Sequence, residues 1–272
     1  MKVIVILIGA LVGLALLIWL GLKVKPAPFP SYPGGATEFE TVPLPANLPA
    51  LVERFYRQLY GDRIPIITSA VISGRAEVRP FGGITLPARF RFIHEAGKNY
   101  RHYIEATFFG LPFMQVNERY VDGVSKAELP FGVTDEGPKV EQAANLGLWA
   151  ETMTSMPAVF LTDPRVRWEP FGDDSALLIV PFGDGEDRFV VRFDPESGLV
   201  RYMEAMRYRD SKSARKSLWI AENVEWASLN GQLISVVGAA TWFEQGSPWA
   251  VFTTEEVVYN ADVQQYVRQR GY

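Results

Sequence analysis

The chain has 272 residues, of which 48% are hydrophobic and 13% aromatic, so it can bury a substantial core and is not globally disordered. Its net charge is −4, and no block of lysine or arginine offers the positive surface that nucleic-acid binding requires. Cysteine is absent, which excludes disulfides, thiolate metal sites and a lipid-modified N-terminal cysteine. Histidine occurs only at His94 and His102, so a site with three histidine ligands is also excluded.

The first predicted element is a membrane-spanning helix. Residues 3–22 carry no charge and are mainly apolar, and about 20 such residues cross a hydrocarbon layer of ~30 Å. The run is longer than the ~7–15 apolar residues of a signal peptide, and no A-x-A-like cleavage site follows it. We therefore predict an uncleaved anchor in residues 1–25 and a single pass through the cell membrane. Lys2 on one side and Lys23 and Lys25 on the other leave the orientation open. By analogy with signal-anchor proteins, we expect the domain on the extracytoplasmic side.

A segment rich in proline and glycine follows the anchor, at residues 26–45. Such a composition keeps a chain extended without packing it, so we predict a stalk. One domain is then expected to span residues 46–272. At its start, Asn47 is placed to cap a helix that ends at Gly61, and the apolar face of this helix is expected to lie on a sheet.

Twelve segments with strand-like patterns lie on both sides of one long helix. Those before the helix are residues 66–79, 84–94, 99–109, 114–121 and 124–129, and those after it are 166–171, 176–182, 188–194, 200–209, 219–229, 233–243 and 251–259. Turn pairs such as Asp122-Gly123 and Asn230-Gly231 predict consecutive antiparallel hairpins. About a dozen antiparallel strands curl and do not remain flat. The predicted fold class is therefore mainly β (α+β), a curved antiparallel half-barrel sheet that wraps a central helix, with an N-terminal transmembrane helix.

The central helix is predicted between Asp135 and Pro157. Asp135 and Gly137 are suited to accept the free N–H groups at its start, and Pro157 stops it. Apolar residues occupy two sides of its helical wheel, so both sides are expected to be covered. Glu151 projects from the side made of small residues, where a carboxylate needs a partner or a cavity. Two interpretations stay open. In the first, Glu151 has a structural role and pairs with a backbone N–H or an arginine. In the second, it lines a pocket.

Other constellations give weaker signals. His94 and His102 fall on neighbouring strands, but two histidines are weak evidence for a metal, and we predict no metal site. The acidic turn at residues 183–187 lacks the spacing of a calcium loop and is expected to be solvated. No motif for a serine nucleophile, a phosphate-binding loop or a dinucleotide site is present in the sequence. A pair of carboxylates such as Glu151 and Glu118 would suit a glycosidase-like hydrolase, but many proteins of this size contain such a pair.

Several short motifs occur in a fixed order within residues 51–259. They are E-R-Y-V-D-G-V-S at 118–125, L-W-A-E at 148–151, M-P-A-V-F-L at 156–161, V-R-W-E at 166–169 and R-F-D-P-E-S-G-L-V-R at 192–201, followed by a late tryptophan-containing strand and Tyr259. In this order the chain resembles an uncharacterised bacterial family related to the lipoprotein carriers of the LolA/LolB type. One departure is Ser125, where a second glycine is expected after Gly123. The resemblance implies a convex antiparallel half-barrel closed by helices, with an apolar cavity that in the carriers receives acyl chains, and it does not imply an enzyme.

The sequence therefore favours a membrane-anchored, non-enzymatic domain that binds a lipid or another apolar ligand in the concave groove of its sheet. The candidate ligand-binding residues are Glu151, Trp149, Met153, Trp168, Arg119 and Tyr120. Glu151 is expected to orient a polar head group or to pair with Arg119. No cofactor and no nucleic acid are expected, and residues 3–22 are expected to contact the lipid bilayer. The alternatives are an envelope structural or interaction module whose own side chains fill the cavity, and a carboxylate-dependent hydrolase.

Overall fold

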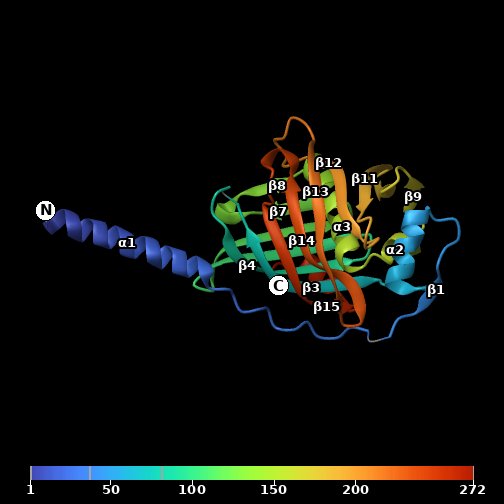
Figure 1. Ribbon diagram of the computed structural model, residues 1–272, viewed down its shortest axis with the longest axis horizontal. Helices are drawn as coiled ribbons and strands as arrows, with labels where there is room; N and C mark the ends of the chain where they lie inside the picture. Colours follow the sequence, from blue (N-terminus) through green and yellow to red (C-terminus); the bar gives the residue numbers. More distant parts are fainter. Residues whose placement is uncertain (1, 37, 81, 272) are drawn as a thin grey trace.

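One antiparallel sheet of 13 strands forms the body of the protein in the computed structural model, which describes residues 2–36, 38–80 and 82–271 (Figure 1). Its strands are β3 (Ser69–Val78), β4 (Leu86–Glu95), β5 (Asn99–Phe108), β6 (Leu111–Val121), β7 (Val124–Glu128), β8 (Thr134–Glu136), β9 (Arg167–Pro170), β10 (Ser175–Phe182), β11 (Gly185–Phe193), β12 (Val200–Arg207), β13 (Ser217–Leu229), β14 (Gln232–Trp242) and β15 (Ala250–Tyr259). The other elements are α1 (Lys2–Lys23), α2 (Ala50–Tyr60), α3 (Pro138–Ser155), α4 (Val159–Thr162), α5 (Gln264–Arg268), the 3-10 turns η1 (Pro130–Gly132) and η2 (Phe243–Gln245), and the separate pair β1 (Thr41–Pro43) and β2 (Arg63–Pro65).

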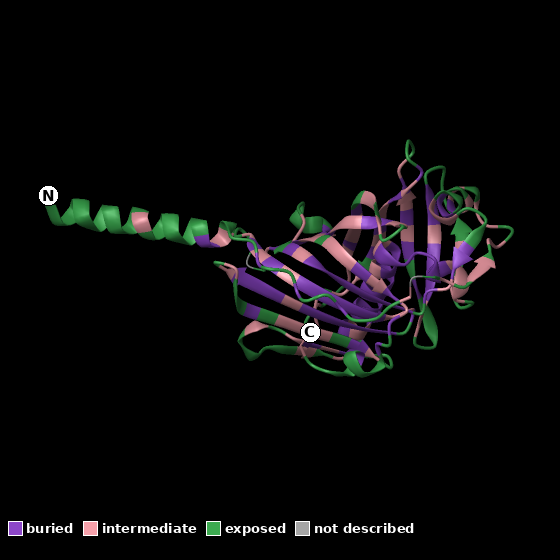
Figure 2. Cartoon of the chain, turned by 90° about the horizontal axis from the view of Figure 1, so that it is seen from below, coloured by how far each residue is buried: buried purple, intermediate pink, exposed green. Residues whose placement is uncertain are grey.

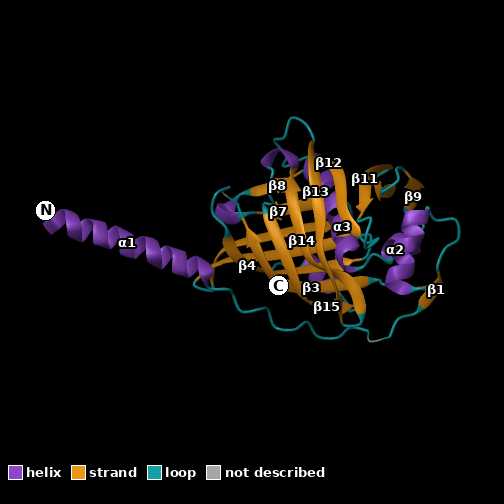
Figure 3. Ribbon diagram, in the orientation of Figure 1, coloured by secondary structure: helices purple, strands orange, loops and turns teal. Residues whose placement is uncertain are grey.

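The strand order is β8-β7-β6-β5-β4-β3-β15-β14-β13-β12-β11-β10-β9. Two runs of antiparallel hairpins, one on each side of α3 in the sequence, are joined where β3 pairs with β15, with Ile72 opposite Val257. The first long strand therefore pairs with the last, which joins the two runs into one sheet with β8 and β9 at its edges. The curved sheet encloses α3, which contacts β6 and β7 on one side and β10, β12 and β14 on the other (Figure 3). The predicted fold class is confirmed.

Each of the twelve predicted strand segments matches a strand. The turns Asp122-Gly123 and Asn230-Gly231 have positive φ at both residues, which is the type I′ geometry that suits two-residue hairpins. Ser125 lies beyond the first of these turns, inside β7. A second glycine is therefore not required for this hairpin, although the resemblance suggested one.

Two predicted helix starts are corrected. The long helix α3 begins at Pro138, and the Gly137 carbonyl accepts the Val140 and Glu141 N–H groups. Asp135 does not cap it, because this residue lies in the unpredicted strand β8 and its carboxylate accepts the Ser211 backbone N–H at 3.2 Å. Helix α2 begins after Pro49 without a side-chain cap, so Asn47 does not cap it either, whereas the predicted end at Gly61 is confirmed, with a φ of 70°.

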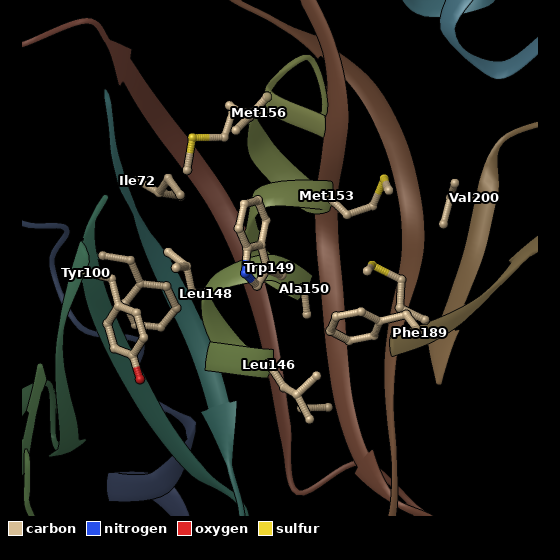
Figure 4. Close-up of a cluster of buried hydrophobic side chains, with 14 of the residues drawn as sticks. Ile72, Tyr100, Leu146, Leu148, Trp149, Ala150, Met153, Met156, Phe189 and Val200 are labelled. Carbon is tan, nitrogen blue, oxygen red and sulfur yellow. The ribbon is translucent and has the colours of Figure 1, made fainter. Parts of the chain in front are cut away.

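The core lies between α3 and the concave face of the sheet (Figure 4). Trp149 and Met153 of α3 are both fully buried, and Trp149 packs on Phe160 of α4 with ring centroids 5.6 Å apart. At one end of the sheet, Phe55 of α2 is fully buried and makes an edge-to-face contact with Trp226. Each large apolar side chain buried in this way contributes ~1.5–3 kcal/mol to stability. The helix is covered on both sides, as its pattern predicted.

The acidic turn at residues 183–187 is only partly solvated. Asp187 is buried, and its two carboxylate oxygens accept hydrogen bonds from Gln142 Nε2 at 3.1 Å and Asn145 Nδ2 at 3.0 Å. Both amides belong to α3, so this carboxylate fixes the helix onto β11. The prediction of a solvated turn is wrong at Asp187, because a carboxylate with hydrogen-bond partners can be buried at acceptable cost.

The segment rich in proline and glycine is extended, but it is not a free stalk. It runs along the outer face of the sheet from α1 to β1 (Figure 1). Phe29 and Tyr32 are buried there, and the Tyr32 N–H donates to Glu256 Oε2 at 3.3 Å. Near its end, the Ala36 N–H donates to the Tyr259 carbonyl at 2.8 Å. The expectation of an unpacked spacer is wrong because two aromatic side chains among the prolines bind the segment to the sheet.

Helix α1 projects from one end of the domain and is exposed along almost all of its length (Figure 2). The mean hydropathy of its most apolar 18 residues is 3.1. Within the described ranges it is the one helix long and apolar enough to cross a membrane. Gly21, near its end, is buried, and the Gly21 carbonyl accepts the Phe109 N–H at 2.9 Å. The predicted helix is confirmed, and its insertion in a membrane remains a proposal.

Candidate functional site

The carboxylate of Glu151 is held by the two histidines of the chain. Glu151 Oε2 lies 2.9 Å from His94 Nε2 and 2.7 Å from His102 Nε2. Glu151 comes from α3, His94 from β4 and His102 from β5. In the register of these strands His94 lies opposite Tyr100 and His102 lies opposite Phe92, so the two histidines are diagonal neighbours on the inner face. Three elements thus bring one carboxylate and two imidazoles together.

Aromatic packing fixes the orientation of the His102 ring. Tyr100 precedes it by two residues on the same face and stacks on it, with centroids 3.9 Å apart and planes at 12°. Phe92, its cross-strand partner, contacts the other side with centroids 4.1 Å apart. His94 and His102 are both buried, whereas about a quarter of the Glu151 side chain, 26%, is exposed. Glu151 is therefore the most exposed residue of the cluster, although its Oε2 atom, which faces the histidines, is buried.

A second carboxylate lies on the far side of His102. Glu118 of β6 is 3.9 Å from His102 Nδ1 and accepts a hydrogen bond from the Tyr100 hydroxyl. From β12, Arg207 reaches the same region, with its guanidinium 4.4 Å from the centre of the Trp219 ring. His102 is consequently placed between two carboxylates, with an arginine nearby to balance their charge.

The pKa values of the cluster follow from burial and these neighbours. Burial alone would raise the pKa of Glu151, but the charge of His102 and the contacts with both imidazoles lower it to about 2. Burial opposes protonation of His102, yet Glu151 and Glu118 raise its pKa to about 9. The pKa of His94 is lowered, because burial outweighs the effect of Glu151. At neutral pH the cluster holds an ionised Glu151, a protonated His102 and a neutral His94.

An apolar cavity of about 80 Å³ adjoins Glu151 on the concave side of the sheet. It lies between α3 and the strands β3, β4, β13, β14 and β15. Its walls are mainly aromatic and small side chains, among them Phe90, Phe92, Phe252, Trp219, Ala221, Gly238 and Ala240. Small residues next to large ones leave the space open, because a strand with larger side chains at these positions would fill it. Glu151 is a polar group at the edge of this apolar volume.

The predicted site residues are dispersed in the structure. Glu151 lines the cavity, but Trp149 and Met153 are fully buried in the core and do not. Trp168 is partly buried against Phe160, and Tyr120 lines a separate cleft at the surface. Whether any of them binds a ligand remains a prediction.

The expected ion pair between Glu151 and Arg119 is wrong. Arg119 is exposed on the outer face of the sheet, opposite Arg101 in the register of β5 and β6. Its neighbour Glu118 points inward instead, since successive residues of a strand alternate between the two faces. The partners of Glu151 are His94 and His102, which the sequence placed on neighbouring strands but did not connect with the helix.

The sequence analysis also missed most of the cavity wall. Phe90 and Phe92 fall within the predicted strand at residues 84–94, but no sequence pattern connected them with Trp219, Ala221 and Phe252. The signal that was available is the presence of alanine and glycine at inward positions of β13 and β14 beside aromatic residues. Interpreting that signal requires the register between these strands, which is not a local property of the sequence.

One solved structure similar to this chain is a DUF1329 family protein from Desulfovibrio piger, with 12% identity, a TM-score of 0.43 and coverage of 75% of this chain and 90% of that chain. Another is a domain from Vibrio parahaemolyticus described as an outer membrane lipoprotein-sorting protein domain, with 10% identity, a TM-score of 0.43 and coverage of 80% of this chain and 94% of that chain. A third is a LolA superfamily protein from Nitrosomonas europaea, with 8% identity, a TM-score of 0.49 and coverage of 81% of this chain and 96% of that chain.

A comparison with curated protein sequences gave no match. The model of one protein family, described as a family of unknown function (DUF6544), matches residues 38–254. This range contains the whole sheet except the last residues of β15, together with α2, α3 and the cluster around Glu151. Because the match covers more than half of the chain, the protein belongs to the DUF6544 family.

Proposed function

We propose that the protein is a membrane-anchored, non-enzymatic domain that binds the acyl chain of a lipid, or a similar apolar ligand, in the cavity beside Glu151. The observation that carries this proposal is the combination of a mainly apolar wall with the partly exposed Glu151 at its edge, whereas Glu222, the other carboxylate of the lining, is paired with Arg201. Small-ligand sites are commonly built in this way, with apolar contacts for affinity and a few polar groups for orientation. Phe90, Phe252 and Trp219 would contact the chain, and Glu151 would contact the polar head group.

The size of the cavity sets a condition on binding. Its volume of about 80 Å³ is below the ~300–1,000 Å³ of sites that enclose a drug-sized ligand. A whole acyl chain therefore requires the aromatic side chains of the wall to rotate, or α3 to move away from β14. Such a ligand selects an open state of the protein, and its affinity is reduced by the cost of opening.

Exposed apolar side chains beside α1 support a position at the membrane surface. Phe109, Leu111, Phe113 and Phe131, here called the apolar rim, are all exposed. Phe109 is hydrogen-bonded to the end of α1, and Phe113 and Phe131 line one surface depression. Apolar surface of this kind is typical of a site of interaction, and the adjacent hydrophobic helix favours the bilayer as its partner. The rim would rest on the lipid surface while α1 spans the membrane.

Photo-crosslinking of the full chain in membranes tests this function. A fatty acid that carries a photoreactive group at the end of its chain is incorporated and activated, and the labelled peptides are identified by mass spectrometry. We expect labelling of β13 and β15, which carry Ala221 and Phe252, in addition to labelling of α1. Labelling confined to α1 and the apolar rim would contradict binding in the cavity.

One observation favours a second function, that of an interaction module with a filled core. The small volume of the cavity is compatible with a domain whose own side chains occupy the groove. The hydrolase alternative is less well supported, since the imidazole of His102 separates the carboxylates of Glu151 and Glu118. A glycosidase of the retaining type needs two carboxylates ~5–5.5 Å apart that face one open cleft.

A further inference from the structure

We propose that His94, His102 and Glu151 bind a divalent transition-metal ion. Each residue offers one ligand atom, and the three atoms lie within 4.8 Å of one another. Two imidazole nitrogens and one carboxylate oxygen suit zinc, iron, cobalt or manganese, whereas magnesium and calcium prefer oxygen ligands alone. Three protein ligands of this kind leave coordination positions open for water or another molecule.

The contacts between these residues are close but poorly directed. His94 Nε2, His102 Nε2 and Glu151 Oε2 have no hydrogen bond of acceptable direction to any described group, although they lie only 2.7 and 2.9 Å apart. Buried polar atoms without a hydrogen bond are rare, because leaving them unpaired costs stability. Both histidines are more than nine-tenths buried, so their ring nitrogens are shielded from bulk solvent. One ion would satisfy the three atoms together, and it would replace the proton of His102, which is released to solvent on binding.

The ligand atoms lie slightly closer together than an ion requires. Zinc lies ~2.0–2.2 Å from nitrogen and oxygen ligands, so two ligands of a tetrahedral ion are ~3.3–3.6 Å apart. The distances from Glu151 Oε2 to the two Nε2 atoms are 2.9 and 2.7 Å. A small outward movement of Glu151, the more exposed of the three, would make room for the ion without displacing either histidine.

The surroundings of His102 match those of a metal-binding histidine. Its second nitrogen, Nδ1, faces Glu118, which is itself held by the Tyr100 hydroxyl. Metal-binding histidines usually present their other ring nitrogen to a carboxylate or carbonyl, which fixes the ring and strengthens the ligand. The stacking of Tyr100 and Phe92 on the ring adds to this fixation. Glu118 and Tyr100 are therefore positioning residues of the proposed centre.

The proposed centre and the apolar cavity share Glu151. A head group that contacts Glu151 from that cavity would therefore come close to a bound ion. This last point rests on the proposed function, whereas metal binding itself does not. The two ideas fail separately, since a chain that binds no lipid in the cavity can still bind an ion.

Metal titration of the untagged full chain in detergent tests the site. The protein is treated with a chelator, dialysed, and titrated with Zn²⁺ by calorimetry and with Co²⁺ by visible absorption. We expect one ion of either metal per chain, with a Co²⁺ spectrum typical of nitrogen and oxygen ligands. Glu151→Gln and His94→Ala should each weaken binding at least 100-fold, and Glu118→Gln should weaken it about 10–100-fold, as for other positioning residues.

A matched control distinguishes this site from adventitious binding. Glu255→Gln removes a carboxylate that pairs with Arg75 in a different part of the sheet, and it should bind Zn²⁺ like the wild type. Thermal unfolding shows whether each variant is folded, and Glu151→Gln keeps the shape of the side chain if His94→Ala fails to fold. A folded wild type that binds no ion would overturn the proposal. Binding that is equally strong in Glu151→Gln would overturn it as well.

Discussion

Glu151 is the residue on which the account of the site depends, because it belongs to the histidine cluster and to the cavity wall. From sequence, its position on the small-residue side of the helix already indicated a need for a partner or a cavity, and the structure provides both. Its partners were not predictable, because the register that places His94 and His102 beside each other on one sheet face depends on how β4 and β5 pair. The sequence offered a backbone N–H or an arginine as the partner, and it did not indicate the histidines.

Replacing Glu151 by alanine should lower the stability of the protein substantially. The change leaves a protonated His102 buried without its carboxylate, and breaking a buried ion pair from one side costs ~3–5 kcal/mol. We expect about 3 kcal/mol, at the low end of that range, because Glu151 is 26% exposed. Denaturant unfolding of the full chain, with chelator present, measures the change.

The matched control for this prediction is Glu53→Ala. Glu53 is also a helical carboxylate, but it pairs with Arg57 one turn away at the surface, and such pairs contribute ~0.3–0.5 kcal/mol. Equal stability losses in the two variants would mean that the contacts of Glu151 with the histidines are unimportant for the fold.

At the scale of elements, local patterns were sufficient to find the strands and the central helix. Alternation of side chains and glycine-containing turns depend on neighbours in sequence, so twelve strands were placed without knowledge of the fold. The pairing of β3 with β15 joins residues far apart in sequence, and no local pattern contains it. The packing of Phe29 and Tyr32 was missed for the same reason, since composition alone indicated only an extended segment.

Gly147 in α3 offers a test of how tightly this helix is packed. A Cβ at this position would lie 3.9 Å from Arg207 Nη2 and 4.0 Å from the Tyr100 hydroxyl, which are ordinary contact distances. Glycine inside a helix costs ~0.5–1 kcal/mol relative to alanine. Gly147→Ala should therefore raise the free energy of unfolding by about that amount, measured by denaturant titration.

Gly97, in the turn between β4 and β5, should behave in the opposite way. Its φ is +65°, and a Cβ there would lie 2.8 Å from Asp163 Oδ2 and 3.0 Å from Trp149 Cη2. Gly97→Ala adds backbone strain of ~1–2 kcal/mol to these close contacts, so it should destabilise the protein by more than 1 kcal/mol. If Gly147→Ala instead destabilised the protein by as much as Gly97→Ala, α3 would be packed more tightly around Gly147 than the distances of 3.9 and 4.0 Å indicate.

At the scale of the whole molecule, the segment between α1 and β1 determines where the domain sits. Because Phe29 and Tyr32 bind it to the outer face of the sheet, the domain is not on a long flexible tether. The end of α1 contacts the turn between β5 and β6, which brings the apolar rim next to the hydrophobic helix. A chain arranged in this way would hold one end of its sheet against the bilayer.

A fluorescent label should detect this contact. The chain has no cysteine, so a single introduced cysteine is labelled selectively. Phe131→Cys places the label on the apolar rim, and Phe171→Cys places it at another exposed position, directly after β9 at the end of the domain far from α1 (Figure 1). In liposomes with brominated lipids, we expect quenching of the first label only. Absence of quenching at position 131 would contradict the proposed orientation.

The most direct test of the proposed function is native mass spectrometry of the full chain released from detergent micelles. Ala221 faces the cavity, and its neighbour Ile220 projects from the other face of β13, so Ala221→Phe fills the cavity and Ile220→Phe is the matched control. Lipids bound only around α1 are the same in all three proteins. We predict that the wild type and Ile220→Phe each retain an acyl lipid that Ala221→Phe loses while remaining folded. Equal retention by all three proteins, or a folded wild type that retains no lipid, would contradict the assignment of an apolar ligand to this cavity.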